Sequence, residues 1–106
     1  ALETMKQIYK PLGDQGIPIL QTDLITSELI KYASNSFLTC KIAFINEMAD
    51  LCEVIGADIS QVSTGMGLDK RIGSDFLKAG PGFGGSCFPK DILALQYLTT
   101  RVKSDF

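Results

Sequence analysis

The feature that most constrains the fold is the stretch from Asp23 to Ile55, which contains neither proline nor glycine and is rich in helix-forming residues. Proline and glycine are the residues that most readily end a helix, so their absence predicts one continuous helix. At about 1.5 Å per residue, this helix of about 30 residues would be roughly 48 Å long. Asp23 or Thr26 is suited to cap its first turn, and Gly56 is suited to end it.

Apolar residues occur around most of the circumference of this predicted helix. One side carries Leu29, Ala33, Phe37, Cys40, Phe44, Met48, Leu51 and Ile55, and other positions carry Ile30, Leu38, Ile42, Ile45 and Cys52. A helix that is apolar nearly all round must be buried by more than one neighbour. Because the rest of the chain is short, we expect one neighbour to be a second copy, which gives a homodimer through the long helix. We interpret the two cysteines on this helix as core residues.

Shorter elements are predicted on both sides of the long helix. Residues 2–12 have helical spacing that Pro11 and Gly13 should end, and residues 17–20 are an apolar run containing a proline, typical of an edge strand. Asp58 and Gln61 form a capping-box pattern that opens a short helix, which we expect to end at the glycines 65 and 67. A final helix is predicted from apolar residues at Ile92, Leu93, Leu95 and Leu98. The fold class is therefore all-α, with one long helix and three or four shorter ones.

Residues 80–91 combine a glycine-rich loop, a cysteine and a helix start. Four glycines in six residues let the backbone adopt positive φ and approach a ligand closely. Cys87 precedes the helix that Pro89 opens, where the positive end of the helix dipole and Lys90 both favour a thiolate. An isolated cysteine is more often a small buried hydrophobe. An inert buried cysteine needs no glycine-rich approach, however, so we interpret Cys87 as a nucleophile.

The same glycines match the spacing G-x-G-x-x-G of a dinucleotide-binding loop, through Gly80, Gly82 and Gly85. Such a loop must directly follow a strand of a βαβ unit. Residues 74–79 are too polar and too short to be a central strand. We therefore do not interpret this loop as a Rossmann fingerprint.

Two further patterns point to a binding site. Lys31 and Asn35 are four residues apart on the long helix, so their side chains share a face. Such a pair is often simply two solvated side chains on the protein surface. An ammonium and an amide directed into one site are also good hydrogen-bond donors to a developing oxyanion. Arg71 lies in a polar connection before the glycine loop, and its planar guanidinium suits a diphosphate as well as an ordinary surface.

Composition excludes several classes of function. The chain has no histidine, which excludes Ser–His and Cys–His catalysis within it, so a general base must be lysine, aspartate or glutamate. A net charge of −2 without a basic run argues against nucleic acid as the main partner. No signal peptide or membrane-length apolar run is recognisable. Three cysteines without a C-x-x-C pair suit a reducing compartment, and we expect a cytoplasmic protein.

Several blocks of the sequence resemble one known family. Residues 71–73, 76–80 and 82–91 (G-F-G-G-S-C-F-P-K-D) are similar to a signature of the UDP-glucose/GDP-mannose dehydrogenase family. Residues 28–35 and 44–47 are similar to its other hallmark, in the same order and spacing. A lone G-G-x-C would be a weak signal, but these blocks together are highly specific and span nearly the whole chain.

The resemblance implies a particular fold and activity. Residues 23–106 would be an all-α central domain like the C-terminal dimerisation domain of 6-phosphogluconate dehydrogenase. Residues 1–22 would be the tail of a preceding NAD-binding Rossmann domain, and a UDP-binding domain would follow. The enzyme would use NAD to oxidise the C6 alcohol of UDP-glucose to a carboxylate, in UDP-glucuronate and polysaccharide biosynthesis. This chain alone, without the Rossmann domain, should be inactive.

The resemblance also assigns roles to single residues. Cys87 would be the catalytic nucleophile, Lys31 and Asn35 the oxyanion donors, and Asp91 a residue that orients water or acts as a base. Cys87 and Lys90 would contact NAD, and no metal is implied. Arg71 would reach the substrate of the neighbouring subunit. The substrate contacts would be Lys31, Asn35, Arg71, Phe76, Leu77, Lys78, Gly80, Gly82, Phe83 and Gly84, with Phe76 next to the uracil. We interpret Asn46 and Glu47 as structural hydrogen-bonding residues.

Two other functions stay open. One is a sibling oxidoreductase that acts on GDP-mannose or on a UDP-N-acetyl sugar, although residues 69–72 and 80–83 resemble the UDP-glucose branch more. The other is a non-catalytic dimerisation module. Ligand-dependent protection of the Cys87 thiol would distinguish an enzyme from such a module, because a purely structural cysteine should show none.

Overall fold

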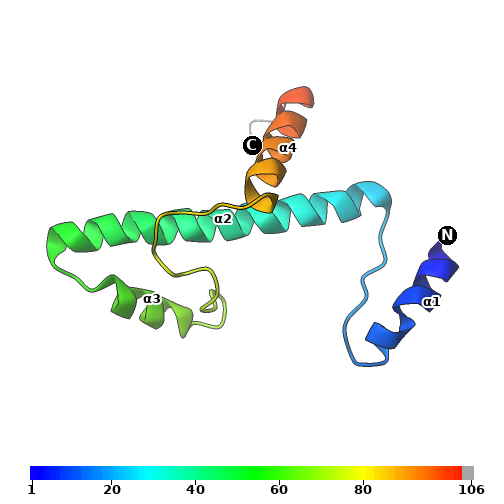
Figure 1. Ribbon diagram of the computed structural model, residues 1–106, viewed down its shortest axis with the longest axis horizontal. Coiled ribbons are helices and arrows are strands. Elements are labelled where there is room, and N and C mark those ends of the chain that lie inside the picture. The colour runs from blue at the N-terminus through cyan, green and yellow to red at the C-terminus, as the bar shows by residue number, and fades with distance from the viewer. Residues whose placement is uncertain (104–106) are drawn as a thin grey trace.

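The computed structural model describes residues 1–103, which form four helices and, within that range, no strand (Figure 1). In chain order these are α1 (Leu2–Gly13), α2 (Leu24–Ile55), α3 (Ile59–Gly67) and α4 (Cys87–Arg101). Helix α2 has 32 residues and runs through the middle of the molecule. The predicted all-α fold with one long helix is confirmed.

Helix α2 is capped at its two ends by residues predicted from the sequence, Asp23 and Gly56. The Asp23 carboxylate accepts a hydrogen bond from the Thr26 N–H at 2.9 Å, so it pairs one of the amides that a helix start leaves free. The bonds from the Thr26 hydroxyl and amide lower the pKa of Asp23. At the other end Gly56 has a φ of 76°, which glycine adopts without a steric clash, and its N–H bonds to the Cys52 carbonyl.

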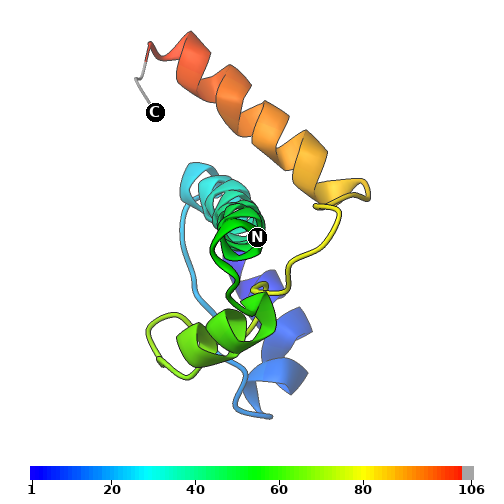
Figure 2. The same cartoon turned by 90° about the vertical axis from the view of Figure 1, so that its left-hand side faces the viewer.

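Helices α3 and α4 pack on opposite sides of α2, as Figure 2 shows with α2 seen nearly end-on. Asp58 caps α3 by accepting from the Ser60 N–H at 2.8 Å, and the Gln61 side chain donates to Asp58 at 3.2 Å, as the capping pattern predicts. Gly65 lies inside α3, which continues to Gly67, so only the second of the two glycines ends this helix. Cys87 is itself the first residue of α4 and does not precede it.

The N-terminal segment differs from the prediction in two respects. Pro11 lies within α1, which continues to Gly13, so the proline does not end the helix. The run of residues 17–20 is not a strand, because a strand needs a hydrogen-bonding neighbour and residues 1–103 provide none. Helix α1 stands apart from the other three helices (Figure 1) and buries none of its residues.

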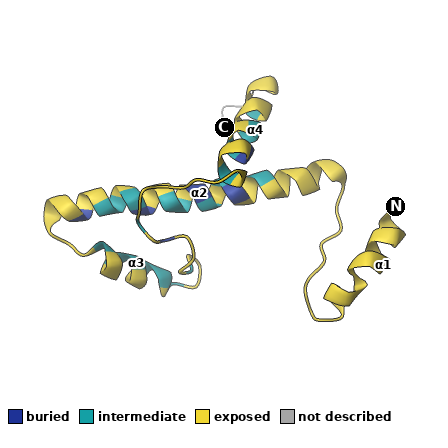
Figure 3. Ribbon diagram, viewed as in Figure 1, coloured by how far each residue is buried: buried dark blue, intermediate teal, exposed yellow. Residues whose placement is uncertain are grey.

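The buried core is small and follows α2 (Figure 3). Within residues 1–103 the buried hydrophobic residues are Ile45, Cys52 and Leu77. Cys40 was expected in the core with Cys52, but it is exposed, because it borders open hollows between α2 and its neighbours α3 and α4 instead of a packed interior. No helix in the described part of the chain is long and apolar enough to cross a bilayer.

The chain leaves far more surface open than a self-contained domain of its mass. Its accessible surface is 8474 Å², whereas a folded monomer of this mass has about 5,800 Å². Its radius of gyration is 18.1 Å, against about 13 Å for a compact domain of this length. Exposed apolar side chains include Phe37, Leu24 and Val54, which are 67%, 81% and 83% exposed. An exposed apolar surface of this extent is typical of an interface with further protein.

Candidate active site

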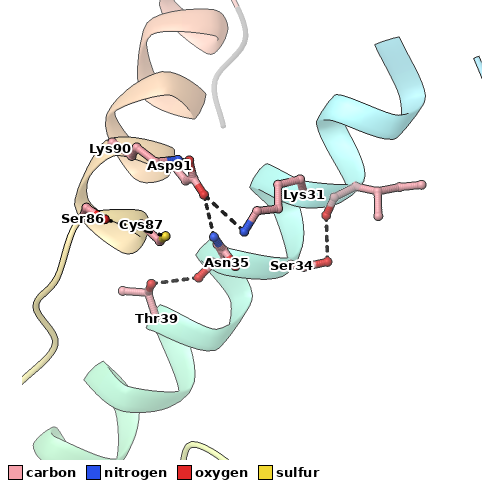
Figure 4. Close-up of polar contacts among 9 residues, drawn as sticks. Lys31, Ser34, Asn35, Thr39, Ser86, Cys87, Lys90 and Asp91 are labelled. Atoms are coloured by element: carbon pink, nitrogen blue, oxygen red, sulfur yellow. Dashed lines mark hydrogen bonds and ion pairs between the residues drawn. The ribbon is translucent and has the colours of Figure 1, made fainter. Parts of the chain in front are cut away.

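The first turn of α4 meets the N-terminal half of α2 at a cluster of charged and amide side chains (Figure 4). At its centre is Asp91, which is only 1% exposed. Asn35 Nδ2 donates a hydrogen bond to Asp91 Oδ2 at 2.5 Å, and Lys31 Nζ lies 3.6 Å from the same oxygen. Lys90 Nζ is 2.5 Å from the other oxygen, Oδ1. The carboxylate thus holds two lysines and an amide around one point.

Helical spacing explains why these groups meet. Lys31 and Asn35 lie one turn apart on α2, so both face α4. Cys87 and Asp91 lie one turn apart on α4, so both face α2. Asn35 is nearly buried, and Thr39 Oγ1 donates to its carbonyl oxygen at 2.8 Å. The structure therefore brings together the four residues predicted to be catalytic.

Electrostatics keeps the centre of this cluster ionised. The hydrogen bond from Lys90 lowers the pKa of Asp91 most, and the bond from Asn35 and the charges of Lys90 and Lys31 add to it, whereas desolvation opposes them. The same bond to Asp91 raises the pKa of Lys90. Asp91 was expected to orient water or to act as a base. A buried carboxylate with a lowered pKa and both oxygens engaged is a weak base, and this geometry favours a positioning role.

Cys87 is the first residue of α4, and it is exposed. In Figure 4 its side chain points from α4 toward Asn35, and its sulfur lies 3.9 Å from Ser86 Oγ. An accessible thiol at a helix N-terminus, opposite an ammonium and an amide, can attack a carbonyl carbon whose oxygen those donors stabilise. No group of acidic and cysteine side chains within residues 1–103 is arranged to bind a metal ion.

The glycine-rich loop is fastened to α2 and α3. The Gly80 N–H donates to Asn46 Oδ1 at 2.9 Å, which gives Asn46 the structural role predicted for it. Ser63 of α3 donates a short hydrogen bond to the Leu77 carbonyl, and the Leu77 side chain is buried. The predicted substrate residues beyond Leu77 are exposed around this path, namely Lys78, Gly80, Gly82, Phe83 and Gly84. Gly82 has a φ of 102°, a backbone conformation that only glycine readily adopts.

Arg71 is not part of the cluster around Asp91. Its Nε and Nη2 donate to the Asp69 carboxylate at 3.0 and 2.6 Å, and its side chain is 89% exposed. It borders a hollow with Phe37 and Phe44 on the α3 side of α2. The structure therefore places Arg71 in a different site from Cys87. The guanidinium is exposed on its outer side, so a ligand can reach it.

Sequence reasoning missed one residue of the site, Phe88. Its ring packs edge-to-face on Phe76 and Phe83, with ring centroids 6.1 and 6.0 Å apart. Phe76 was predicted as a ligand contact, and it has a φ of 62°, which is unusual for a large side chain. The sequence has three phenylalanines in and around the glycine-rich loop. A loop has no regular spacing of side chains, however, so the sequence does not predict that these rings touch.

The all-helical fold of this chain is found within a solved nucleotide-sugar dehydrogenase. It superimposes with a TM-score of 0.86 on a UDP-glucose dehydrogenase from Pyrobaculum islandicum, at 40% sequence identity over 98% of this chain and 23% of that one. Residues 25–106 match the model of the UDP-glucose/GDP-mannose dehydrogenase family, central domain. The chain belongs to this family, and the predicted resemblance is confirmed.

Two curated relatives are UDP-glucose 6-dehydrogenases. The UDP-glucose 6-dehydrogenase of Rickettsia typhi is 68% identical over 101 residues, which are 95% of this chain and 23% of that protein. UDP-glucose 6-dehydrogenase YwqF of Bacillus subtilis is 56% identical over 103 residues, which are 97% of this chain and 23% of that protein. The chain therefore spans about a quarter of the length of these relatives.

Proposed function

We propose that this chain is the central part of an NAD-dependent UDP-glucose 6-dehydrogenase, which converts UDP-glucose, two NAD and water into UDP-glucuronate and two NADH for polysaccharide biosynthesis. The observation that carries the proposal is the placement of exposed Cys87 on α4 opposite Lys31 and Asn35 of α2, around the buried carboxylate of Asp91. The names of the close relatives support the choice of substrate.

The residues of the cluster suit a two-stage oxidation. Once the C6 alcohol has become an aldehyde, the Cys87 thiolate adds to its carbon, and the oxygen gains negative charge. Lys31 and Asn35 donate hydrogen bonds to that oxygen. Loss of hydride from the resulting thiohemiacetal gives a thioester at Cys87. Water then attacks the thioester, which releases the carboxylate and returns the thiolate. Asp91 holds both donors in place throughout.

Two residues of this chain fit a dinucleotide. Cys87 and Lys90 are both exposed on the first turn of α4, and the Lys90 ammonium complements the negative charge of a diphosphate. NAD supplies the hydride acceptor for both oxidations. Most of its binding site would lie in a preceding Rossmann domain, and we assign residues 1–22 to the tail of that domain because α1 packs on none of the other helices. Residues 23–106 would form the central domain.

The test is an assay of the complete enzyme with UDP-glucose, GDP-mannose and UDP-N-acetyl sugars. We expect two NADH for each UDP-glucuronate formed, and no comparable turnover of the other sugars. Preference for GDP-mannose would reassign the chain to a sibling oxidoreductase. Absence of turnover with all of these sugars, together with a Cys87 thiol that no nucleotide sugar protects, would indicate a dimerisation module.

The isolated chain should form a two-fold dimer through α2 and show no turnover. The exposed apolar residues on α2 make a patch larger than soluble monomers usually leave open, and a two-fold axis lets the same surface cover itself. Sedimentation equilibrium and an NADH assay measure the two expectations. A stable monomer contradicts the packing argument, and measurable turnover contradicts the assignment of the NAD site to a separate domain.

Arg71→Ala should raise the KM of the complete enzyme for UDP-glucose more than tenfold, about 1.4 kcal/mol of lost binding. The guanidinium is exposed and pairs with Asp69, outside the cluster around Asp91, so we expect it to serve the substrate of the neighbouring subunit. Steady-state kinetics measures the effect, with exposed Lys70→Ala as the matched control that keeps the KM. An unchanged KM in Arg71→Ala removes this residue from the site.

A further inference from the structure

We infer that Phe88 is a positioning residue that links the loop for the nucleotide sugar to the nucleophile; the inference rests on the proposed function. Phe88 follows Cys87 directly and is half-buried in the first turn of α4. Its ring makes edge-to-face contacts with Phe76 and with Phe83, at interplanar angles of 62° and 81°. We call Phe76, Phe83 and Phe88 the aromatic cluster. Edge-to-face pairs have a preferred geometry, so displacement of one ring acts on the next.

The aromatic cluster is the side-chain contact of the loop with α4. The loop is fastened elsewhere, since Gly80 bonds to Asn46 of α2 and Leu77 to Ser63 of α3. In the described part of the chain, no side-chain hydrogen bond or ion pair joins residues 76–85 to α4. The rings therefore provide the side-chain connection between a loop held by α2 and α3 and the turn that carries the thiol, beside the backbone that joins them.

The backbone of Phe76 supports a functional role for this connection. Its φ of 62° is a conformation that a large side chain adopts only when the surrounding structure holds it there. Phe88 is the aromatic neighbour of Phe76 and is within edge-to-face distance. A ligand that contacts Phe76 or Phe83 will thus shift the ring of Phe88. Because Phe88 follows Cys87 directly in the backbone, this shift changes the position of Cys87. The nucleotide part of the substrate would in this way help to set the position of the thiol.

The test measures how fast iodoacetamide alkylates Cys87 in the complete enzyme, with and without UDP, by mass spectrometry of the Cys87 peptide. UDP lacks the glucose whose C6 would lie over the thiol, so its effect must pass through the protein. In the wild type we expect UDP to change the rate about fivefold or more. In Phe88→Ala the two rates should become equal although UDP still binds. The kcat for UDP-glucose should fall about tenfold or more, with a smaller change in KM.

Two other variants separate positioning from simple stability. Phe88→Tyr keeps the ring and should keep the UDP effect. Leu95→Ala weakens the packing of α4, where Leu95 borders a hollow with Thr39 and Cys40 of α2, without touching the aromatic cluster, so it too should keep the UDP effect. If Phe88→Ala does not fold, Phe88→Leu keeps most of the apolar volume without the ring and gives the same comparison.

The outcomes distinguish this inference from the proposed function. No oxidation of UDP-glucose by the wild type overturns the proposed function. Normal oxidation, with no UDP effect in the wild type or with an undiminished UDP effect in Phe88→Ala, overturns only the role of Phe88. Loss of the UDP effect in Leu95→Ala as well as in Phe88→Ala also overturns it, because general loosening of α4 would then explain both.

Discussion

Replacing Cys87 by alanine in the complete enzyme is expected to lower UDP-glucuronate formation by about 10⁴-fold or more, while UDP-glucose still binds. Without the sulfur neither the thiohemiacetal nor the thioester can form, so the route from aldehyde to acid is lost. Binding should persist because the loop is fastened by Asn46 and Ser63, which the substitution does not touch. Chromatography of the acid and calorimetry of UDP-glucose binding measure the two quantities.

Cys40→Ala is the matched control for this experiment. Cys40 is also an exposed free cysteine, but it lies on α2 outside the cluster around Asp91 and should leave turnover unchanged. Acid formation by Cys87→Ala at a rate near that of the wild type would exclude covalent catalysis at this residue. Loss of UDP-glucose binding in Cys87→Ala, with turnover kept in Cys40→Ala, would instead show that Cys87 supports the binding site.

Local rules predicted the helices well, because each signal acts within a few residues. Asp23 caps α2, and Gly56 ends it with a positive φ, as hydrogen-bonding capacity and backbone freedom require. The shared faces of Lys31 with Asn35 and of Cys87 with Asp91 follow from helical spacing alone. The candidate site was predictable to this extent, as two pairs of residues on two helices.

Contacts between elements were not predictable in this way. That Asp91 is buried and holds Lys31, Asn35 and Lys90 depends on where α4 crosses α2, and helical period does not specify a crossing point. The family resemblance implied a residue that orients water or acts as a base, whereas the geometry favours one that positions the donors. The same limit explains the exposure of Cys40, since an apolar helix face reveals that it needs a partner but not which chain provides it.

The second large effect is expected from Asp91→Asn, which keeps the shape of the side chain but removes its charge. We expect kcat to fall about 10²-fold, because Lys31 and Asn35 lose the carboxylate that directs them to the reacting oxygen. The pKa of Asp91 is lowered from 3.8, mainly by its bond from Lys90, so this carboxylate stays ionised at neutral pH. The ionised Asp91 carboxylate therefore contributes fully to the stability of the fold above about pH 4. That contribution is lost only as the pH falls through the lowered pKa.

The pH dependence of kcat decides between a positioning role and a base. A positioning Asp91 titrates below the working range, so Asp91→Asn should lower kcat by the same factor at every pH between about 6 and 9. A base would instead impose an acidic limb on the wild-type profile, and the substitution would abolish that limb. Exposed Asp50→Asn on α2 removes the same charge without reaching the cluster and should leave the profile unchanged. Both oxygens of Asp91 already contact Lys31, Asn35 or Lys90. We therefore expect Asp91→Asn to lower kcat by the same factor across this pH range.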